Sequence, residues 1–130
     1  MPELPEVQTV VDILQDKLPG KTIQSVCSPN GYKGVFENGS LASYRAFLCE
    51  CQIQSIWRKG KFIIMKLDSG YLLFHLRMTG RFILDLPNKS EFKYISFQLK
   101  FSDGFNLFFR DTRKFGRVYI CQELDWLEAR

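Results

Sequence analysis

The sequence has no long apolar run, no CxxC pair of cysteines and only one histidine. A membrane-spanning helix needs about 20 consecutive apolar residues, and no stretch of the 130 residues comes near that length. The first 15 residues contain acids and prolines where a secretion signal needs a basic and then an apolar stretch. These absences predict a soluble chain that is not exported and does not bind a membrane.

The four cysteines are not spaced like a metal site. Cys27, Cys49, Cys51 and Cys121 form no CxxC pair, and the single residue between Cys49 and Cys51 is a spacing that structural zinc sites rarely use. In an unexported protein, thiols stay reduced and pack as small apolar groups. We therefore expect four reduced, mostly buried thiols, with no disulfide and no metal.

Composition and charge allow a folded domain but identify no partner. The chain has 18 Lys and Arg against 14 Asp and Glu, a formal net charge of +4, which permits a basic surface without requiring one. Its residues are 45% hydrophobic and 15% aromatic, with twelve Phe. This composition is enough for a sizeable core in one domain.

The hydrophobic pattern changes from helical to strand-like near residue 22. Apolar residues recur at helical spacing within 5–18, where Pro5 suits the first turn and Pro19-Gly20 ends the run. A short helix is expected at 41–49, and the start of another at 125–130. Strands are expected at 22–27, 53–57, 62–67, 71–76, 81–86, 94–101, 105–110 and 118–121.

Eight strands without alternating helices predict a mainly β fold with an N-terminal α-helix. An antiparallel sandwich or barrel satisfies this pattern, and we take it as a β-sandwich of about eight strands with flanking helices. Gly in 68–70 and 103–104 indicates hairpin turns. Within 94–101 the apolar residues alternate with Ser96, Gln98 and Lys100, which predicts one buried and one wet face.

The N-terminus has an unusual sequence, Met1 followed by Pro-Glu-Leu-Pro-Glu-Val. Because Pro2 is small, we expect Met1 to be removed, which exposes a secondary amine. An α-amino group has a reference pKa of about 7.7 to 8.0, against about 10.4 for lysine, so more of it is unprotonated at pH 7. Its attack on a sugar C1′ or a carbonyl gives an iminium ion, an electron sink that permits elimination. Glu3 and Glu6 are candidate acids and bases; alternatively, these residues only begin a helix.

Three further segments place cations and a large apolar side chain around a Gly at a strand end. The cations suit phosphates, Gly allows close backbone approach, and Met or Phe can wedge into a base stack. For any one segment the alternative is a solvated charged turn beside a core aromatic. The segments are Arg58-Lys59-Gly60-Lys61-Phe62, His75-Leu76-Arg77-Met78-Thr79-Gly80-Arg81 and Asp111-Thr112-Arg113-Lys114-Phe115-Gly116-Arg117.

PELPEV, RKGKF, HLRMTGR and DTRKFGR together resemble the bacterial formamidopyrimidine-DNA glycosylase family, in the same order and at similar spacing from Pro2 to Arg117. The resemblance implies the N-terminal catalytic domain of a base excision repair enzyme with DNA glycosylase and abasic-site lyase activities. Its substrate would be double-stranded DNA containing oxidised purines, such as 8-oxoguanine and formamidopyrimidines, or abasic sites. It also implies no cofactor in this domain, a monomer, and a cytoplasmic location at the bacterial nucleoid.

The resemblance assigns a catalytic or phosphate-binding role to five residues. Pro2 would be the Schiff-base nucleophile at C1′ of the damaged nucleotide, and Glu3 the general acid that assists opening of the sugar ring. Glu6 would lie near the everted base. Lys61 and His75 would hold phosphates flanking the lesion, although a single His on an apolar strand is more often a satisfied core or edge residue.

Three more residues would fill the space that the flipped nucleotide leaves. These are Met78, Arg113 and Phe115, with Arg113 facing the orphaned base. Unstacking a base costs a few kcal/mol, which apolar wedges and an orienting cation offset. The alternative for Met78 and Phe115 is core packing. Three further cations either contact phosphates or are solvated surface charges, and the sequence does not decide between these roles: Arg77, Arg81 and Arg117.

The chain also departs from the family pattern. Members carry a second domain, with a helix-two-turn-helix and usually a four-cysteine zinc finger, that has no counterpart here, so we interpret the chain as an excised N-terminal domain with weakened DNA binding and impaired activity. If Met1 is retained, the Pro2 nitrogen is a tertiary amide and cannot form a Schiff base. Gln8 replaces the family's usual acid, which we interpret as a surface change of small consequence.

Two alternatives from other functional classes stay open. The first is a non-catalytic module that binds damaged DNA by sensing a distorted duplex through Met78, Arg113 and Phe115. The second is a small sandwich that binds a protein or a small ligand. The first predicts DNA binding that does not depend on Pro2 or Glu3, and the second predicts no DNA affinity even at low salt.

Overall fold

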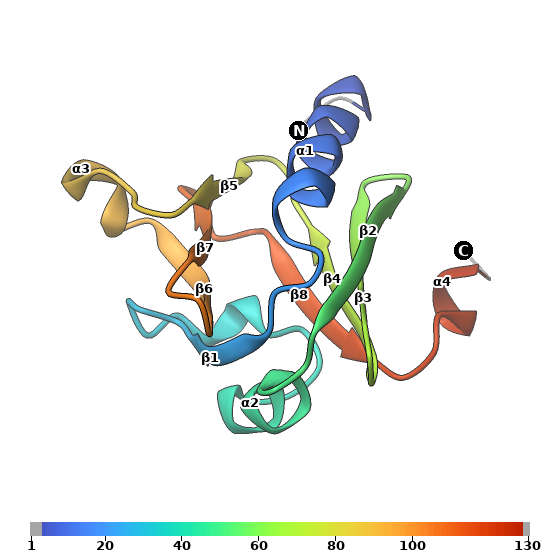
Figure 1. Ribbon diagram of the computed structural model, residues 1–130. Coiled ribbons are helices and arrows are strands. Elements are labelled where there is room, and N and C mark those ends of the chain that lie inside the picture. The colour runs from blue at the N-terminus through green and yellow to red at the C-terminus, as the bar shows by residue number, and fades with distance from the viewer. Residues whose placement is uncertain (1–3, 129–130) are drawn as a thin grey trace.

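Figure 1 shows a computed structural model of the chain, which describes residues 4–128. Two four-stranded antiparallel sheets pack face to face, one in the order β1-β6-β7-β5 and the other in the order β2-β3-β4-β8. The predicted eight-stranded sandwich with an N-terminal helix is confirmed. The strands are β1 (Ile23–Cys27), β2 (Ile53–Lys59), β3 (Phe62–Leu67), β4 (Gly70–His75), β5 (Gly80–Leu84), β6 (Ile95–Phe101), β7 (Asn106–Asp111) and β8 (Arg117–Cys121).

The eight strands lie within two residues of their predicted ends. The largest extension is in β2, which continues to Lys59 because Arg58 and Lys59 pair with β3 up to the hairpin turn. These polar residues carry no hydrophobic signal, so the pattern could not include them. The hairpins predicted at 68–70 and 103–104 are also present, and their glycines have positive φ.

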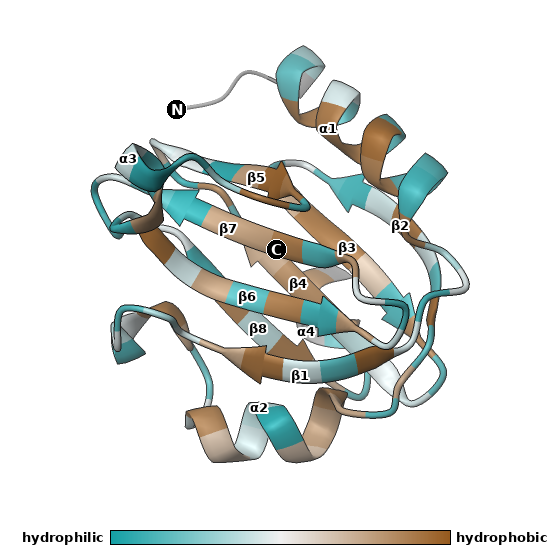
Figure 2. Ribbon diagram, turned by 60° about the vertical axis from the view of Figure 1, so that its left-hand side comes forward, coloured by the Kyte–Doolittle hydropathy of each residue, from teal (hydrophilic) through white to brown (hydrophobic). Residues whose placement is uncertain are grey.

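Two helices flank the sandwich where the periodicity predicts them. α1 (Leu4–Lys17) buries its apolar stripe and packs beside β2, while α2 (Leu41–Leu48) covers β1, as Figure 2 shows. Ser40 and Ser43 form a capping box that begins α2. The helical start expected at 125 is α4 (Asp125–Glu128). Two short elements were not predicted, the 3-10 helix η1 (Lys33–Val35) and α3 (Lys89–Phe92).

The wet face predicted for 94–101 is wrong at Ser96. Its side chain is only 3% exposed, and its hydroxyl donates to the carbonyl oxygen of Phe109 at 3.4 Å. The register with β7 shifts between Ile95 and Phe97, an irregularity that interrupts strict alternation in this inner strand. A local shift of this kind leaves no mark in the hydrophobic pattern.

Phenylalanines from both sheets meet in the middle of the sandwich. Phe74 of β4 contacts Phe82, Phe97 and Phe109 of the opposite sheet, with ring centroids 4.8, 5.6 and 5.7 Å apart. These separations and the tilted planes are those of favourable aromatic pairs. The contacts hold the two sheets together next to the end where β4 leads into β5.

The helices among residues 4–128 are too short or too polar to cross a membrane.

Tyr44 of α2 generates a test of the core. Its side chain is fully buried, and its hydroxyl lies 2.7 Å from the carbonyl oxygen of Val118 in β8. Burial raises the pKa of Tyr44 above its ordinary value. The phenol therefore stays neutral in the folded protein at pH values where an unfolded chain ionises it.

We expect Tyr44→Phe to lower the free energy of unfolding at neutral pH by about 1–2 kcal/mol, because it removes a buried hydrogen bond. Because the pKa of Tyr44 is raised in the folded state, its contribution to the free energy of unfolding is fully present below about pH 10. This contribution is lost as the pH rises above that value, where the phenol ionises in the unfolded chain. Tyr44→Phe has no ionisable group at this position, so its free energy of unfolding falls less at alkaline pH. Urea unfolding of both proteins at neutral and alkaline pH measures the difference, and an unchanged gap between them would contradict the assignment.

Candidate functional site

The three motif segments meet at one end of the sandwich. In one sheet, His75 at the end of β4 pairs with Phe62 of β3 and with Arg117 of β8. In the other sheet, Gly80 at the start of β5 pairs with Asp111 at the end of β7. The connections β4–β5 and β7–β8 cross between the sheets at this end, so residues far apart in sequence become neighbours.

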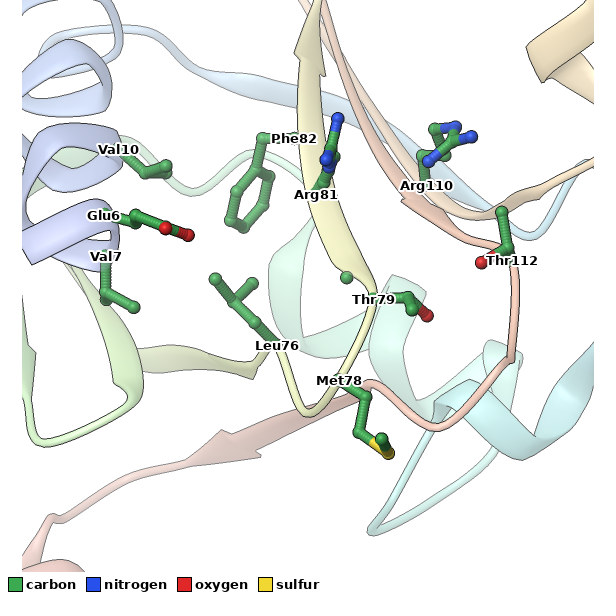
Figure 3. Close-up of a pocket in the computed structure, with 11 residues that line it drawn as sticks. Glu6, Val7, Val10, Leu76, Met78, Thr79, Arg81, Phe82, Arg110 and Thr112 are labelled. Carbon is green, nitrogen blue, oxygen red and sulfur yellow. The ribbon is translucent and has the colours of Figure 1, made fainter. Parts of the chain in front are cut away.

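A cavity of about 530 Å³ opens between α1 and this end of the sandwich (Figure 3). Val7 and Val10 of α1 and Leu76 and Phe82 form its apolar part, and the Glu6 carboxylate points from α1 into it. Its volume is in the range of small-molecule sites. The other lining residues are Met78, Thr79, Gly80, Arg81, Arg110 and Thr112.

Met78, Arg113 and Phe115 lie on the two connecting loops and are exposed. Met78 and Phe115 each keep 47% of their surface accessible, so core packing, the alternative for both, is excluded. Arg77 and Lys114, which precede Met78 and Phe115, have φ of 55° and 59°. Non-glycine residues rarely adopt this left-handed conformation, so neighbouring contacts must hold both loops.

Asp111, which is not among the predicted site residues, supplies the central contact of the two loops. It is completely buried, and its carboxylate accepts hydrogen bonds from the Thr79 hydroxyl, from the Arg113 N–H at 3.2 Å and from the Gly116 N–H at 2.6 Å. Thr79 belongs to the β4–β5 loop, and the other two donors belong to the β7–β8 loop. A buried carboxylate is stable only when it is paired in this way. In the sequence, the only indication of a role for Asp111 is its position as the first residue of the DTRKFGR motif.

Two loop glycines are required by space. A Cβ at Gly80 would lie 2.8 Å from the Phe109 ring, and a Cβ at Gly116 would lie 2.6 Å from it. The ring cannot move aside easily, because Phe74 and Phe82 pack against it. The third motif glycine, Gly60, has open space around it, and its φ of +60° is the reason for glycine there.

The β7–β8 loop has further supports outside Asp111. The Tyr32 hydroxyl donates to the Lys114 carbonyl at 3.1 Å, and the Lys114 ammonium lies 5.2 Å from the Tyr32 ring centre. Arg117 donates to the carbonyls of Lys114 and Gly116 at 2.8 and 2.9 Å. Arg117 therefore has a structural role, whereas Arg77 and Arg81 are exposed. Tyr32 stands in no motif, and sequence reasoning missed it.

Lys61 lies in the turn between β2 and β3, beside the end of β4 that carries His75. Lys61 precedes Phe62, the cross-strand partner of His75, and both polar side chains are half-buried. The His75 Nδ1 accepts the Arg77 N–H at 3.0 Å, so in the neutral ring the proton is on Nε2. Nε2 is then a hydrogen-bond donor, as an anion-binding histidine requires.

Two catalytic predictions, Pro2 and Glu3, lie outside the described residues. The interpretation of Gln8 as a surface change of small consequence is wrong, because its side chain is half-buried and bonded. Its Oε1 accepts a hydrogen bond from Arg58 of β2 at 2.8 Å, and its amide N–H donates to Asp12 at 2.9 Å. Gln8 thus connects the first turns of α1 to the end of β2, where the RKGKF motif begins.

The cysteines are free thiols. Only Cys51 is buried, and the other three are half-buried, so we expected too much burial. Burial raises the pKa of Cys27 and of Cys51, which makes their thiolates scarce at neutral pH. Residues 4–128 contain no group of three or more His, Cys, Asp or Glu arranged for a metal ion.

The packing of Phe109 predicts an effect of Gly116→Ala. We expect it to lower the free energy of unfolding by about 1–3 kcal/mol, because the added methyl overlaps a buried ring. Gly60→Asn is the matched control, since Asn tolerates positive φ and the space is open. Urea denaturation measures both variants. Equal effects would show that ring contact is not what requires Gly116.

The chain is similar to proteins of a known family. Residues 1–118 match the model of the formamidopyrimidine-DNA glycosylase N-terminal domain. The formamidopyrimidine-DNA glycosylase of Chloroflexus aurantiacus is 36% identical over 121 residues, and that of Bacillus subtilis is 39% identical over 122. Each match covers 92% of this chain and 43% of the relative, so the chain spans less than half the length of these curated relatives.

Solved structures agree with the sequence matches. A complex between the Lactococcus lactis Fpg and abasic-site DNA superposes with a TM-score of 0.85 at 30% identity, covering 98% of this chain and 47% of that one. MutM in complex with DNA containing carbocyclic 8-oxo-G gives 0.86 at 30% identity, covering 98% and 48%.

Proposed function

Because the chain belongs to the formamidopyrimidine-DNA glycosylase family, we propose that it is the catalytic N-terminal part of a DNA glycosylase and abasic-site lyase that removes oxidised purines. The main support is one end of the sandwich, where exposed Met78 and Phe115, the cations and the Glu6 cavity lie together. Double-stranded DNA with an oxidised base or an abasic site is the partner that this combination suits.

The reaction begins at the N-terminal amine of Pro2 once Met1 is removed. Its nitrogen bonds to C1′ of the damaged nucleotide while the bond from C1′ to the base breaks, and the base leaves with a proton. Glu3 donates a proton to the sugar-ring oxygen as the ring opens, which leaves an iminium ion on C1′. This ion accepts the electrons released when C2′ loses a proton, and the phosphates on either side are then eliminated in turn.

The cavity beside α1 is where we place the everted base. Its apolar walls suit the faces of a base, and the Glu6 carboxylate can accept hydrogen bonds from ring and exocyclic N–H groups. α1 begins at Leu4, two residues before Glu6, and Pro2 and Glu3 directly precede it in the sequence. The same helix thus places Glu6 in the cavity, four residues after Pro2 in the sequence.

The loops serve the DNA around the lesion. Lys61, in the turn between β2 and β3, and the Nε2–H of His75, at the end of β4, bind the phosphates that flank the lesion. Met78 and Phe115 fill the gap in the base stack that the everted nucleotide leaves, and Arg113 faces the orphaned base. Arg77 and Arg81, both exposed at this end, add positive charge towards the backbone.

Borohydride trapping tests the chemistry. A chain freed of Met1, checked by intact mass, should form a covalent adduct with an abasic duplex at low salt. In Pro2→Gly, which also permits Met1 removal, adduct formation should fall about tenfold or more, because the imine of a primary amine must be protonated to accept electrons.

Two outcomes would contradict this assignment. Absence of any wild-type adduct, even at high protein concentration, rejects the enzyme. Lesion-dependent binding without an adduct would instead support the non-catalytic damaged-DNA module, which is the function left to a chain that retains Met1.

The phosphate contact of Lys61 is tested by salt dependence. We expect Lys61→Ala to reduce the slope of log affinity against log salt by about 1, because one fewer counterion is released. Lys100→Ala removes an equal charge from β6, towards the opposite end of the sandwich, and is the matched control. Fluorescence anisotropy with an abasic duplex measures the slopes. A similar change in both variants would reject a specific contact.

A further inference from the structure

Two loops that present apolar side chains share one buried anion. Met78 lies on the β4–β5 loop and Phe115 on the β7–β8 loop, each 47% exposed. Between them, the Asp111 carboxylate is 0% exposed and accepts donors from both loops. No other carboxyl among residues 4–125 is buried in this way.

The donors form a closed network rather than separate bonds. The Thr79 hydroxyl donates its one proton to Asp111 Oδ1 and accepts the Arg113 N–H at 3.3 Å. The same N–H lies 3.2 Å from Oδ1, and the Gly116 N–H lies 2.6 Å from Oδ2. Hydrogen bonds to a carboxylate are roughly twice as strong as those between neutral groups. The network therefore joins the two loops more firmly than packing of exposed tips could.

Both loops need such support, because each contains a residue in an unfavourable conformation. Arg77 and Lys114 have positive φ directly before Met78 and Phe115. A residue with a side chain adopts this conformation only where its surroundings impose it. The Asp111 network supplies a bond at Thr79, two residues after Arg77, and bonds at Arg113 and Gly116, on either side of Lys114.

We propose that Asp111 is a positioning residue that presents Met78, Arg113 and Phe115 as one preformed unit. The inference rests on the proposed function and names the group that controls entry into the base stack. Preforming the unit lowers the ordering cost of binding a stacked duplex. A single-stranded abasic substrate has no stack to enter, so its reaction does not depend on the unit.

The test compares borohydride trapping on an abasic oligonucleotide, alone and in duplex, for the Met1-free chain. We expect Asp111→Asn to lower the duplex rate about tenfold or more, because the Asn amide places a donor where acceptors are needed. The single-strand rate should stay within about twofold of wild type, since only ordering of the unit is lost.

Two further variants isolate the coupling. Thr79→Val preserves shape and removes one donor, so a smaller loss of about fivefold is expected, again on duplex only. Asp103→Asn makes the same chemical change at the turn between β6 and β7, towards the other end of the strand, and should alter neither rate. Urea denaturation confirms that each variant folds.

An equal fall on both substrates would mean that Asp111 only supports the fold, and an unchanged duplex rate would also overturn the inference. If the wild type forms no adduct on either substrate, the proposed function fails, but loop coupling is still decided by hydrogen exchange in the free chain. Thr79→Val must then accelerate exchange of the Arg113 and Gly116 amides in the other loop. Acceleration confined to its own loop would overturn the coupling.

Discussion

The ring of Phe109 connects the hydrophobic core to the functional end of the sandwich. It is buried against Phe74 of the opposite sheet and occupies the space that a side chain at Gly80 or Gly116 would need. Protein interiors are packed closely, so the two loops can approach each other here only without a Cβ at either position. The placement of the exposed tips is therefore a consequence of core packing.

The same end of the molecule carries features that the fold does not require. Single exposed apolar residues are ordinary on protein surfaces. Here Met78 and Phe115 lie on adjacent loops that a buried carboxylate joins, next to cations and a cavity. Burying Asp111 costs free energy unless every oxygen is satisfied. The proposed DNA partner accounts for this arrangement, because an everted nucleotide leaves a gap in the base stack that exposed apolar side chains can fill.

Much of the fold followed from periodicity, and the exceptions have physical causes. The helix at 5–18 and the eight strands carry their own hydrophobic signal, and so they were predicted within two residues. The irregular register in β6 buries Ser96, and α3 has no buried residue to mark it. The sequence does not reveal the contact of Gln8, because its partner, Arg58, lies fifty residues away on β2. Contacts of this range leave no local pattern.

The sequence alone determined the elements, the antiparallel class and the family motifs, because apolar spacing and motif order are local properties of the chain. The tertiary structure decided which of these segments share a site. Pairing of β4 with β8 and of β5 with β7 brings Thr79 to Asp111, and the approach of the β7–β8 loop to Tyr32 braces Lys114. Such neighbours depend on how two sheets close around one core, and no spacing along the chain encodes that geometry.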